Sequence, residues 1–264
     1  MRFASCKVLG MLAVAAVVCA AGGVAVGAEP PAAPKVSTLA PAKDVVSQIE
    51  TYVGRLEESV ASEDDFKEAE AKVAKDANTL ILLALAAGLH DEDNKAKAAA
   101  PAIMKAAQEL AKAKGYAAAK AGVAAVKKAL DAAEGNPGEL KWVKSASLDD
   151  LMKQVPLVNS RLKRNLRGPK FKSKAKDNAG DAATLAVIAQ GSLADTSEAK
   201  SDEDVTKWYR FCIQMRDAAA SLNKAVHEGN QDAADKAMSA LNQSCDDCHA
   251  VFHKGAEKES GKEN

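Results

Sequence analysis

The chain has 264 residues, in which 36 Lys and Arg balance 36 Asp and Glu, and only 16 residues are Gly and 8 are Pro. A neutral chain has no net attraction for nucleic acid, which argues against a basic nucleic-acid-binding protein. A β-sandwich or a doubly wound sheet is also disfavoured, because the sequence shows no extended β-branched runs with period 2. The composition predicts an all-α protein.

The first 28 residues predict export from the cytoplasm. Arg2 and Lys7 precede an apolar run that ends in Val26-Gly27-Ala28. This order is typical of a secretory signal peptide cut after Ala28, and we expect a periplasmic protein. An uncleaved membrane anchor is the alternative, because the run is about as long as a spanning helix. Residues 29–41 hold four prolines among small residues and predict a flexible tether without a helix.

Two copies of one unit follow, over residues 42–135 and 146–254. The copies align at an offset of 106 and then 105 residues, and the matches include polar positions. Matched residues of the first copy include Asp44, Gln48, Arg55, Phe66, Asp76 and Thr79, and their counterparts are Asp150, Gln154, Arg161, Phe171, Asp181 and Thr184. Chance similarity between Ala-rich helices is the alternative, but the non-alanine identities keep a constant register. Residues 255–264 form a polar tail.

Each copy predicts four helices with short connections. In the second copy, Ser147 caps the first helix, the second runs from about residue 177 to 193, and Ser201 opens the third. Gly229 ends that third helix, and the fourth starts after Asn230. Four amphipathic helices bury their stripes most simply as an antiparallel bundle, so we expect two tandem antiparallel four-helix bundles. Residues expected to fill the core of the first bundle are Leu80, Leu82, Leu83, Leu85, Val123 and Val126.

The fourth helix of the second copy ends in Cys245-Asp246-Asp247-Cys248-His249, the c-type haem attachment signature. Positions three and four apart share a helix face, so both thiols can bond the haem vinyl groups while His249 reaches the iron. A thioredoxin-type redox pair and a zinc site that includes His253 are the alternatives. The first copy has no such equipment. Near the end of the copies the offset grows to about 115 residues, and the residues aligned with Cys245, Cys248 and His249 are Leu130, Ala133 and Glu134.

The second copy resembles the class II cytochromes c, or cytochrome c′ family, in its four predicted helices and its C-terminal haem motif. The aromatic-basic pair after the motif is Phe252-His253, where the family usually has an aromatic residue and Arg. The resemblance implies one covalent haem c, with His249 as proximal iron ligand and a distal residue from the first helix of the copy. In the family that residue is a Met in six-coordinate electron carriers. It is apolar in five-coordinate proteins that bind nitric oxide or carbon monoxide.

Met152 is the candidate distal ligand. Its place near the start of the first helix resembles that of the ligating Met in the four-helix cytochrome b. Core packing is the alternative, because Pro156 one turn later can kink or begin the helix. Leu157 or Val158 would then cover the open face. The first copy has Val46 at this position, so it lacks the Met as well as the cysteines.

The expected function is single-electron transfer with a redox partner protein, without enzymatic catalysis. The alternatives are a five-coordinate haem protein for nitric oxide or carbon monoxide, and a non-redox interaction protein in which the first bundle docks a partner or forms a homodimer. Eight basic and no acidic residues lie between Arg161 and Lys176, which predicts a solvated loop or a docking patch for an acidic partner. Cys212 is expected to be a buried thiol, and His90 and His227 to be solvated or capping residues.

Overall fold

Helices account for the regular structure of the chain. The computed structural model describes residues 29–132, 135 and 138–253, and within these residues it contains α-helices, one short 3-10 helix and no strand. The predicted all-α class is therefore confirmed. Among the described helices, none combines the length and the apolar character that crossing a membrane requires. The predicted signal peptide and polar tail, residues 1–28 and 255–264, lie outside the described residues.

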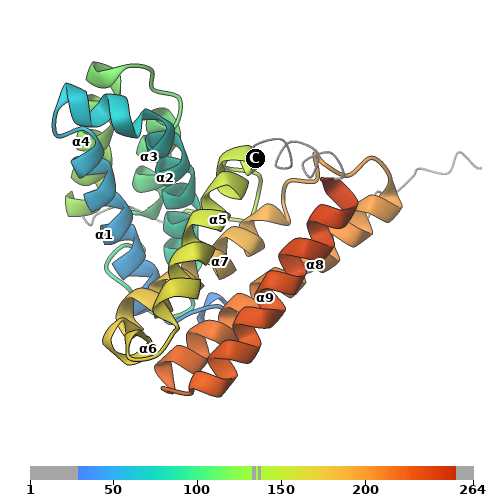
Figure 1. The fold of residues 1–264 in the computed structure, drawn as a ribbon. Helices are drawn as coiled ribbons and strands as arrows, with labels where there is room; N and C mark the ends of the chain where they lie inside the picture. The colour runs from blue at the N-terminus through green and yellow to red at the C-terminus, as the bar shows by residue number, and fades with distance from the viewer. Residues whose placement is uncertain (1–28, 133–134, 136–137, 254–264) are drawn as a thin grey trace, which may run out of the picture.

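The two copies contribute helices of different lengths (Figure 1). The first copy supplies α1 (Ala42–Ser59), α2 (Glu63–Leu89), α3 (Ala100–Leu110) and α4 (Tyr116–Ala132). The second copy supplies α5 (Leu148–Asn165), α6 (Lys170–Ser173), α7 (Ala175–Ser192), α8 (Asp202–His227) and α9 (Gln231–Phe252). Helix α2 is continuous, whereas its counterpart is divided into α6 and α7. Helix α6 is not among the helices expected from the sequence.

The predicted caps begin three helices of the second copy. The Ser147 hydroxyl accepts from the Asp150 backbone N–H at 3.3 Å, and the Ser201 hydroxyl accepts from that of Asp204 at 3.2 Å. The side chain of Asn230 caps α9 in the same way. Each bond satisfies a backbone donor that the first helical turn leaves without a partner. Pro156 does not end α5, which continues through it to Asn165.

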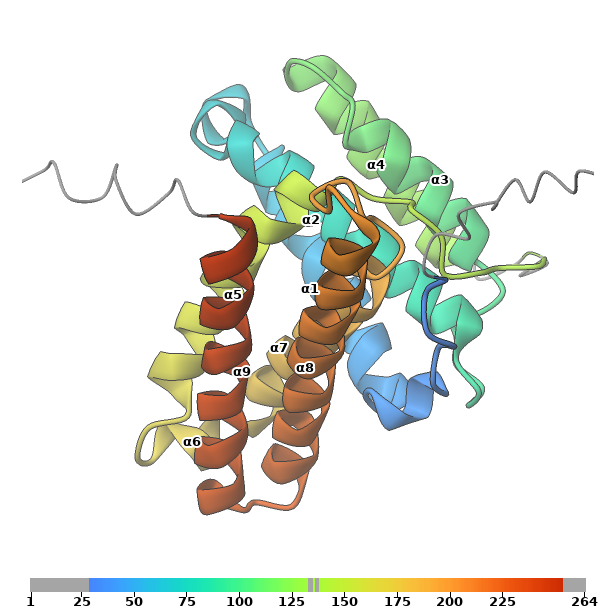
Figure 2. The same cartoon turned by 90° about the vertical axis from the view of Figure 1, so that its right-hand side faces the viewer.

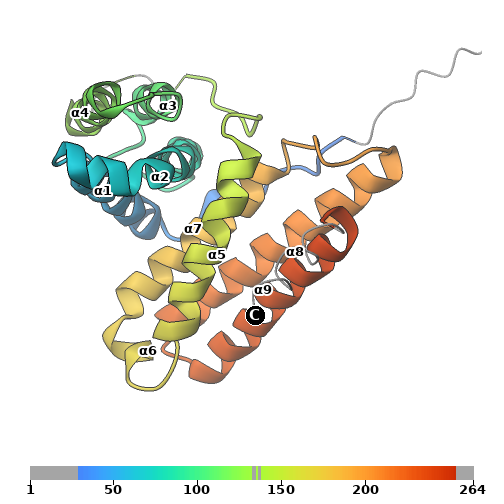
Figure 3. The same cartoon turned by 45° about the horizontal axis from the view of Figure 1, so that its top comes forward.

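The copies differ in how their first helix packs. In the first copy α1 contacts both α2 and α4, and α3 lies between α2 and α4 in the packing order. In the second copy α7, α8 and α9 pack in sequence, but α5 contacts α7 and the first copy's α2. Over their described lengths, α5 and α9 run antiparallel with few close contacts (Figures 1 and 3). The structure therefore does not confirm two separate, closed four-helix bundles.

One apolar core extends through both copies. It includes the predicted leucines of α2 and the stripe of α5, and its buried side chains come from α1 through α9. The crossing of α2 and α7 is especially close, because a Cβ on Gly191 would lie 2.6 Å from Cδ1 of Leu82. Figure 2 shows the helices of the two copies packed side by side at this junction. The shared core joins the two predicted units into one packed structure.

One ion pair recurs at aligned positions of the two copies. Arg55 pairs with Asp76 at 2.9 Å in the first copy, and Arg161 pairs with Asp181 at 2.7 Å in the second. The aligned glutamines reach across the junction. Gln48 on α1 accepts from the Thr184 hydroxyl on α7 at 3.1 Å. Gln154 on α5 donates to Asp76 on α2 at 3.1 Å. Equivalent residues thus make related contacts, which supports an internal duplication.

The segment before α1 differs from its prediction as a flexible tether. Val36–Thr38 form a 3-10 helix, and Val36 and Leu39 are buried. The segment is fixed by the α2–α3 connection, where Asp91 accepts from the Ser37 N–H at 2.8 Å and from its hydroxyl at 2.6 Å. His90, predicted to be solvated or capping, is 1% exposed, and its Nε2 lies 3.0 Å from the Ala40 carbonyl oxygen. Both residues therefore anchor the N-terminal segment.

Candidate functional site

The predicted ligands lie on the last turns of α9. Cys245 and Cys248 are half-buried and are not joined in a disulfide, and His249 is exposed beside them. The ring centroids of His249 and His253 are 5.3 Å apart. The helical spacing brings both thiols to one face, as the sequence analysis predicted, although the thiols are less buried than the rest of the stripe.

A small apolar cluster, separate from the main core, forms the wall beside these residues. We call it the α8 cluster, and its buried members are Leu148, Leu193, Trp208, Tyr209 and Cys212. Met152, Cys248 and Phe252 pack against it as half-buried neighbours. The Trp208 ring meets Phe252 edge-on at 5.4 Å, and its Nε1–H donates to the Ser192 carbonyl at 3.0 Å. The cluster thus places buried apolar side chains next to Cys248, and an apolar macrocycle would require neighbours of this kind.

The register of α5 and α9 places Met152 level with His249. The two antiparallel helices meet where Asn159 Nδ2 donates to Asn242 Oδ1 at 3.0 Å. Met152 lies seven residues before Asn159, and His249 lies seven residues after Asn242. At about 1.5 Å per residue, both lie about 10 Å along their helices from that hydrogen bond. The arrangement agrees with a distal role for Met152.

The surroundings of the motif favour the neutral forms of its thiols and of the His249 imidazole. Burial raises the pKa of the Cys248 thiol to about 11, and it also raises the pKa of Cys245. Partial burial lowers the pKa of His249, and the neighbouring His253 lowers it further. Neutral imidazole has a free lone pair on one ring nitrogen, which is the form that binds a metal.

The other residues named in the sequence predictions differ in burial. Leu157 is 42% exposed, and Val158 is buried in the main core. Within the described part of the chain, no group of three or more His, Cys, Asp or Glu side chains is close enough to hold a metal ion. Cys212 is buried, as expected, and burial raises the pKa of its thiol.

The basic run spans the end of α5, all of α6 and the start of α7. Arg161 makes its ion pair with Asp181, and Lys174 lies 3.2 Å from Asp177. The remaining basic side chains of this run are exposed. They lie at the end of α5 opposite to Met152 (Figure 1). The exposed positive charge fits either of the two predictions for this run.

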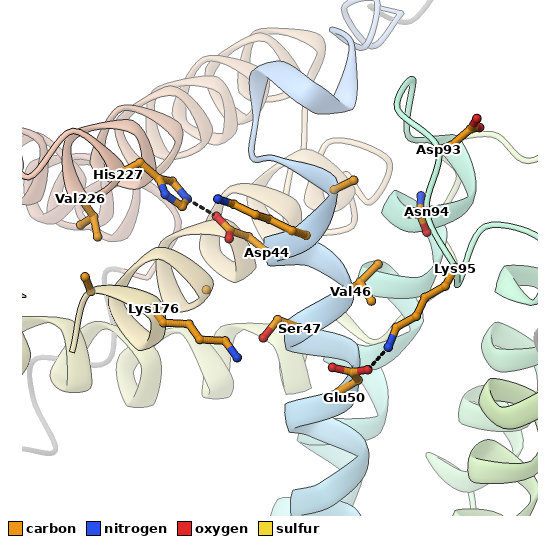
Figure 4. Close-up of a pocket in the computed structure, with 14 residues that line it drawn as sticks. Asp44, Val46, Ser47, Glu50, Asp93, Asn94, Lys95, Lys176, Val226 and His227 are labelled. Carbon is orange, nitrogen blue, oxygen red and sulfur yellow. Dashed lines mark hydrogen bonds and ion pairs between the residues drawn. The ribbon is translucent and has the colours of Figure 1, made fainter. Parts of the chain in front are cut away.

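A cavity of about 760 Å³ lies elsewhere, between α1, α7 and α8. Figure 4 shows two pairs among its polar side chains: His227 Nε2 lies 2.6 Å from Asp44 Oδ2, and Lys95 bonds Glu50. None of Met152, Cys245, Cys248 and His249 lines it. His227 therefore links α8 to α1 and is not simply a solvated histidine.

Sequence reasoning missed the polar residues that hold α5 in place. Gln154 is 1% exposed, and its Nε2 donates to the Tyr52 hydroxyl at 2.8 Å as well as to Asp76. Asn78 on α2 bonds Ser147 and Asp150. One feature of the sequence could have indicated these contacts: both copies have Gln at the aligned positions 48 and 154. A buried amide side chain requires a hydrogen-bond partner.

Comparisons of the chain with protein-family models, with curated proteins and with solved structures found no match.

Proposed function

We propose that the protein is an exported monohaem c-type cytochrome that carries single electrons. In this proposal the two copies are cytochrome c′-like four-helix units, of which the first has lost its haem, and residues 1–28 are a signal peptide that directs the chain to the periplasm. The partner is a second redox protein. The α9 motif and its apolar surroundings carry the proposal, and the resemblance to class II cytochromes c supplies the chemistry.

The residues at the site have the chemistry that a covalent haem needs. The Cys245 and Cys248 thiols would each add across a vinyl group to give a thioether, and an imidazole nitrogen of His249 would bind the iron. When bound, the haem supplies an iron that alternates between the ferric and ferrous states. The protein keeps both thiols on one helix face and presents Met152 from the facing helix.

The observation that carries the proposal is the position of the motif beside the α8 cluster. A zinc site or a thiol oxidoreductase needs no broad apolar wall, but a haem macrocycle does. Three elements provide this wall: Leu148 lies at the start of α5, Leu193 follows the end of α7, and Trp208 lies on α8. Cys248 and Met152 pack against it. Low polarity around the iron limits the solvent reorganisation that accompanies electron transfer and helps set the potential.

Met152 decides between electron transfer and gas binding. A thioether on the distal side fills the last coordination position and raises the reduction potential, whereas an open position admits carbon monoxide or nitric oxide. Met152 is half-buried against the α8 cluster and level with His249, so we favour the six-coordinate form.

The test uses the full-length protein made in a cell that has the haem-attachment machinery. Mass spectrometry of the purified protein should show one covalent haem. Visible spectra of the ferric and ferrous forms should be low-spin, with a methionine-to-iron charge-transfer band in the ferric form, and carbon monoxide should leave the ferrous spectrum unchanged. Met152→Ala should remove the band and allow carbon monoxide to bind.

Met104→Ala is the matched control, because Met104 is also half-buried but lies on α3 of the first copy. It should leave all spectra unchanged. A wild-type protein without covalent haem would refute the cytochrome proposal. Covalent haem with a high-spin spectrum that responds at once to carbon monoxide would instead establish the gas-binding alternative.

A further inference from the structure

The start of α5 is held by the first copy. Asn78 on α2 makes two bonds to it: its Oδ1 accepts from the Ser147 N–H at 2.8 Å, and its Nδ2 donates to Asp150 Oδ2 at 3.0 Å. Asn78 is 4% exposed, so water does not readily replace these partners. The α5 N-terminus is therefore fixed two residues before Met152 by a residue of the other copy.

A second attachment follows two residues after Met152. Gln154 donates to the Tyr52 hydroxyl at 2.8 Å and to Asp76 Oδ1 at 3.1 Å, and all three residues are at most 1% exposed. Contacts with its own copy secure α5 farther along, where Arg161 makes two bonds to Asp181. The segment that carries Met152 is thus bonded on both sides to the first copy.

The facing helix does little to hold this segment. Along their described lengths, α5 and α9 have few close contacts, and Asn159 and Asn242 meet seven residues away from the level of Met152. A helix that is not packed against its neighbour keeps its position through its other contacts. The apolar contacts of α5 come from α2 of the first copy and from α7 and the α8 cluster of its own copy. The side-chain hydrogen bonds on either side of Met152 come from α2 and α1.

We propose that the first copy is a scaffold for the distal side of the haem site, and that Asn78, Asp76 and Tyr52 are positioning residues for Met152. The inference rests on the proposed function and extends it, because it gives the copy without a haem motif a role in the chemistry of the other. The first copy fixes the separation between residue 152 and His249, and this separation determines whether the thioether reaches the iron.

The experiment compares wild type with Asn78→Ala in two forms of the full chain. In protein made without the haem-attachment machinery, hydrogen exchange should quicken about tenfold for α5 amides over residues 148–158, while α8 and α9 exchange as in wild type. In the haem-loaded protein, Asn78→Ala should weaken the methionine-to-iron band and allow carbon monoxide to bind.

Asn94→Ala is the matched control, because Asn94 also uses both amide atoms but bonds only within the first copy, to Ala87 and Ala96. It should change neither readout. Tyr52→Phe serves as a milder variant if Asn78→Ala fails to fold, since it removes only the hydroxyl that accepts from Gln154. Its effect should have the same direction and a smaller size.

Unchanged exchange over residues 148–158 in Asn78→Ala and Tyr52→Phe would overturn the scaffold inference. An unaltered methionine band in haem-loaded Asn78→Ala would overturn it as well. Failure of the proposed function is a different result, because it appears as an absence of covalent haem in wild type. The exchange measurement still tests the scaffold in that case, since it uses the haem-free chain.

Discussion

The two copies use the same polar pairs to build different surroundings for their first helix. Arg55 with Asp76 and Arg161 with Asp181 fix equivalent helices in each copy. Helix α1 then packs against α4, whereas α5 stands away from α9 along most of its length. The hairpin of α8 and α9 is also longer than that of α3 and α4. The comparison shows that equivalent ion pairs occur where the first helix packs against the last, as in the first copy, and where it stands apart from the last, as beside Cys245, Cys248 and His249 in the second.

The largest contrast between the copies is expected in haem attachment. Changing both Cys245→Ser and Cys248→Ser should abolish covalent haem, because no thiol remains in the motif to form a thioether. Leu130→Ala, at the first-copy counterpart of Cys245, should leave haem attachment complete. Mass spectrometry of the intact chains checks both outcomes. Covalent haem in the double variant would show that attachment does not use this motif.

Removing the equivalent arginines should destabilise both copies, but unequally. Arg161→Met leaves the buried Asp181 carboxylate without its cation, and we expect it to lower the free energy of unfolding by about 2–4 kcal/mol, allowing for the partly exposed guanidinium. Arg55→Met should cost about 1 kcal/mol less, because Gln154 still donates to Asp76. Urea unfolding of the haem-free chain measures both values. A larger loss for Arg55→Met would contradict the assigned contacts.

Alanine substitutions at two helical glycines should change the free energy of unfolding by smaller amounts and in opposite directions. Gly191→Ala places a methyl group 2.6 Å from Cδ1 of the buried Leu82, and we expect a loss of about 1–3 kcal/mol in stability. Gly54→Ala meets no atom within 4 Å and should stabilise the chain by up to about 1 kcal/mol. Thermal and urea unfolding test the pair. Equal effects would mean that α2 and α7 do not cross closely in solution.

The smallest effect concerns the N-terminal segment, residues 36–41, which Asp91 of the first copy holds through Ser37. The Ser37 hydroxyl and N–H lower the pKa of Asp91 to about 2. Because the folded pKa lies below the ordinary value near 4, this anchoring is present above about pH 4 and is lost as the pH falls through about 2. An NMR titration of the carboxyl should show that midpoint, and Ser37→Ala should move it upward. An unchanged midpoint would exclude the hydroxyl as the cause.

Local patterns predicted much of this structure, and long-range contacts account for most of what was missed. The caps at Ser147 and Ser201 and the shared face of Cys245 and Cys248 follow from helical periodicity over a few residues. The position of α5 does not, because Gln154 finds Tyr52 from 102 residues away. The same applies to residues 36–41, for which the sequence predicted a tether. Their contacts with Asp91 and His90 join residues 50 or more positions apart.

The partners of Asp44 bear on the timing of folding. This buried carboxylate on α1 accepts from Asn223 at 2.7 Å and lies 2.6 Å from His227 Nε2, residues that follow it by 179 and 183 positions. Because synthesis proceeds from the N-terminus, the first copy is made long before Asn223 and His227, which bond Asp44. Helix α8 closes this contact, and α9 with Cys245, Cys248 and His249 comes directly after it. The last contacts of the first copy and the segment that carries Cys245, Cys248 and His249 are thus made at the same late stage of synthesis.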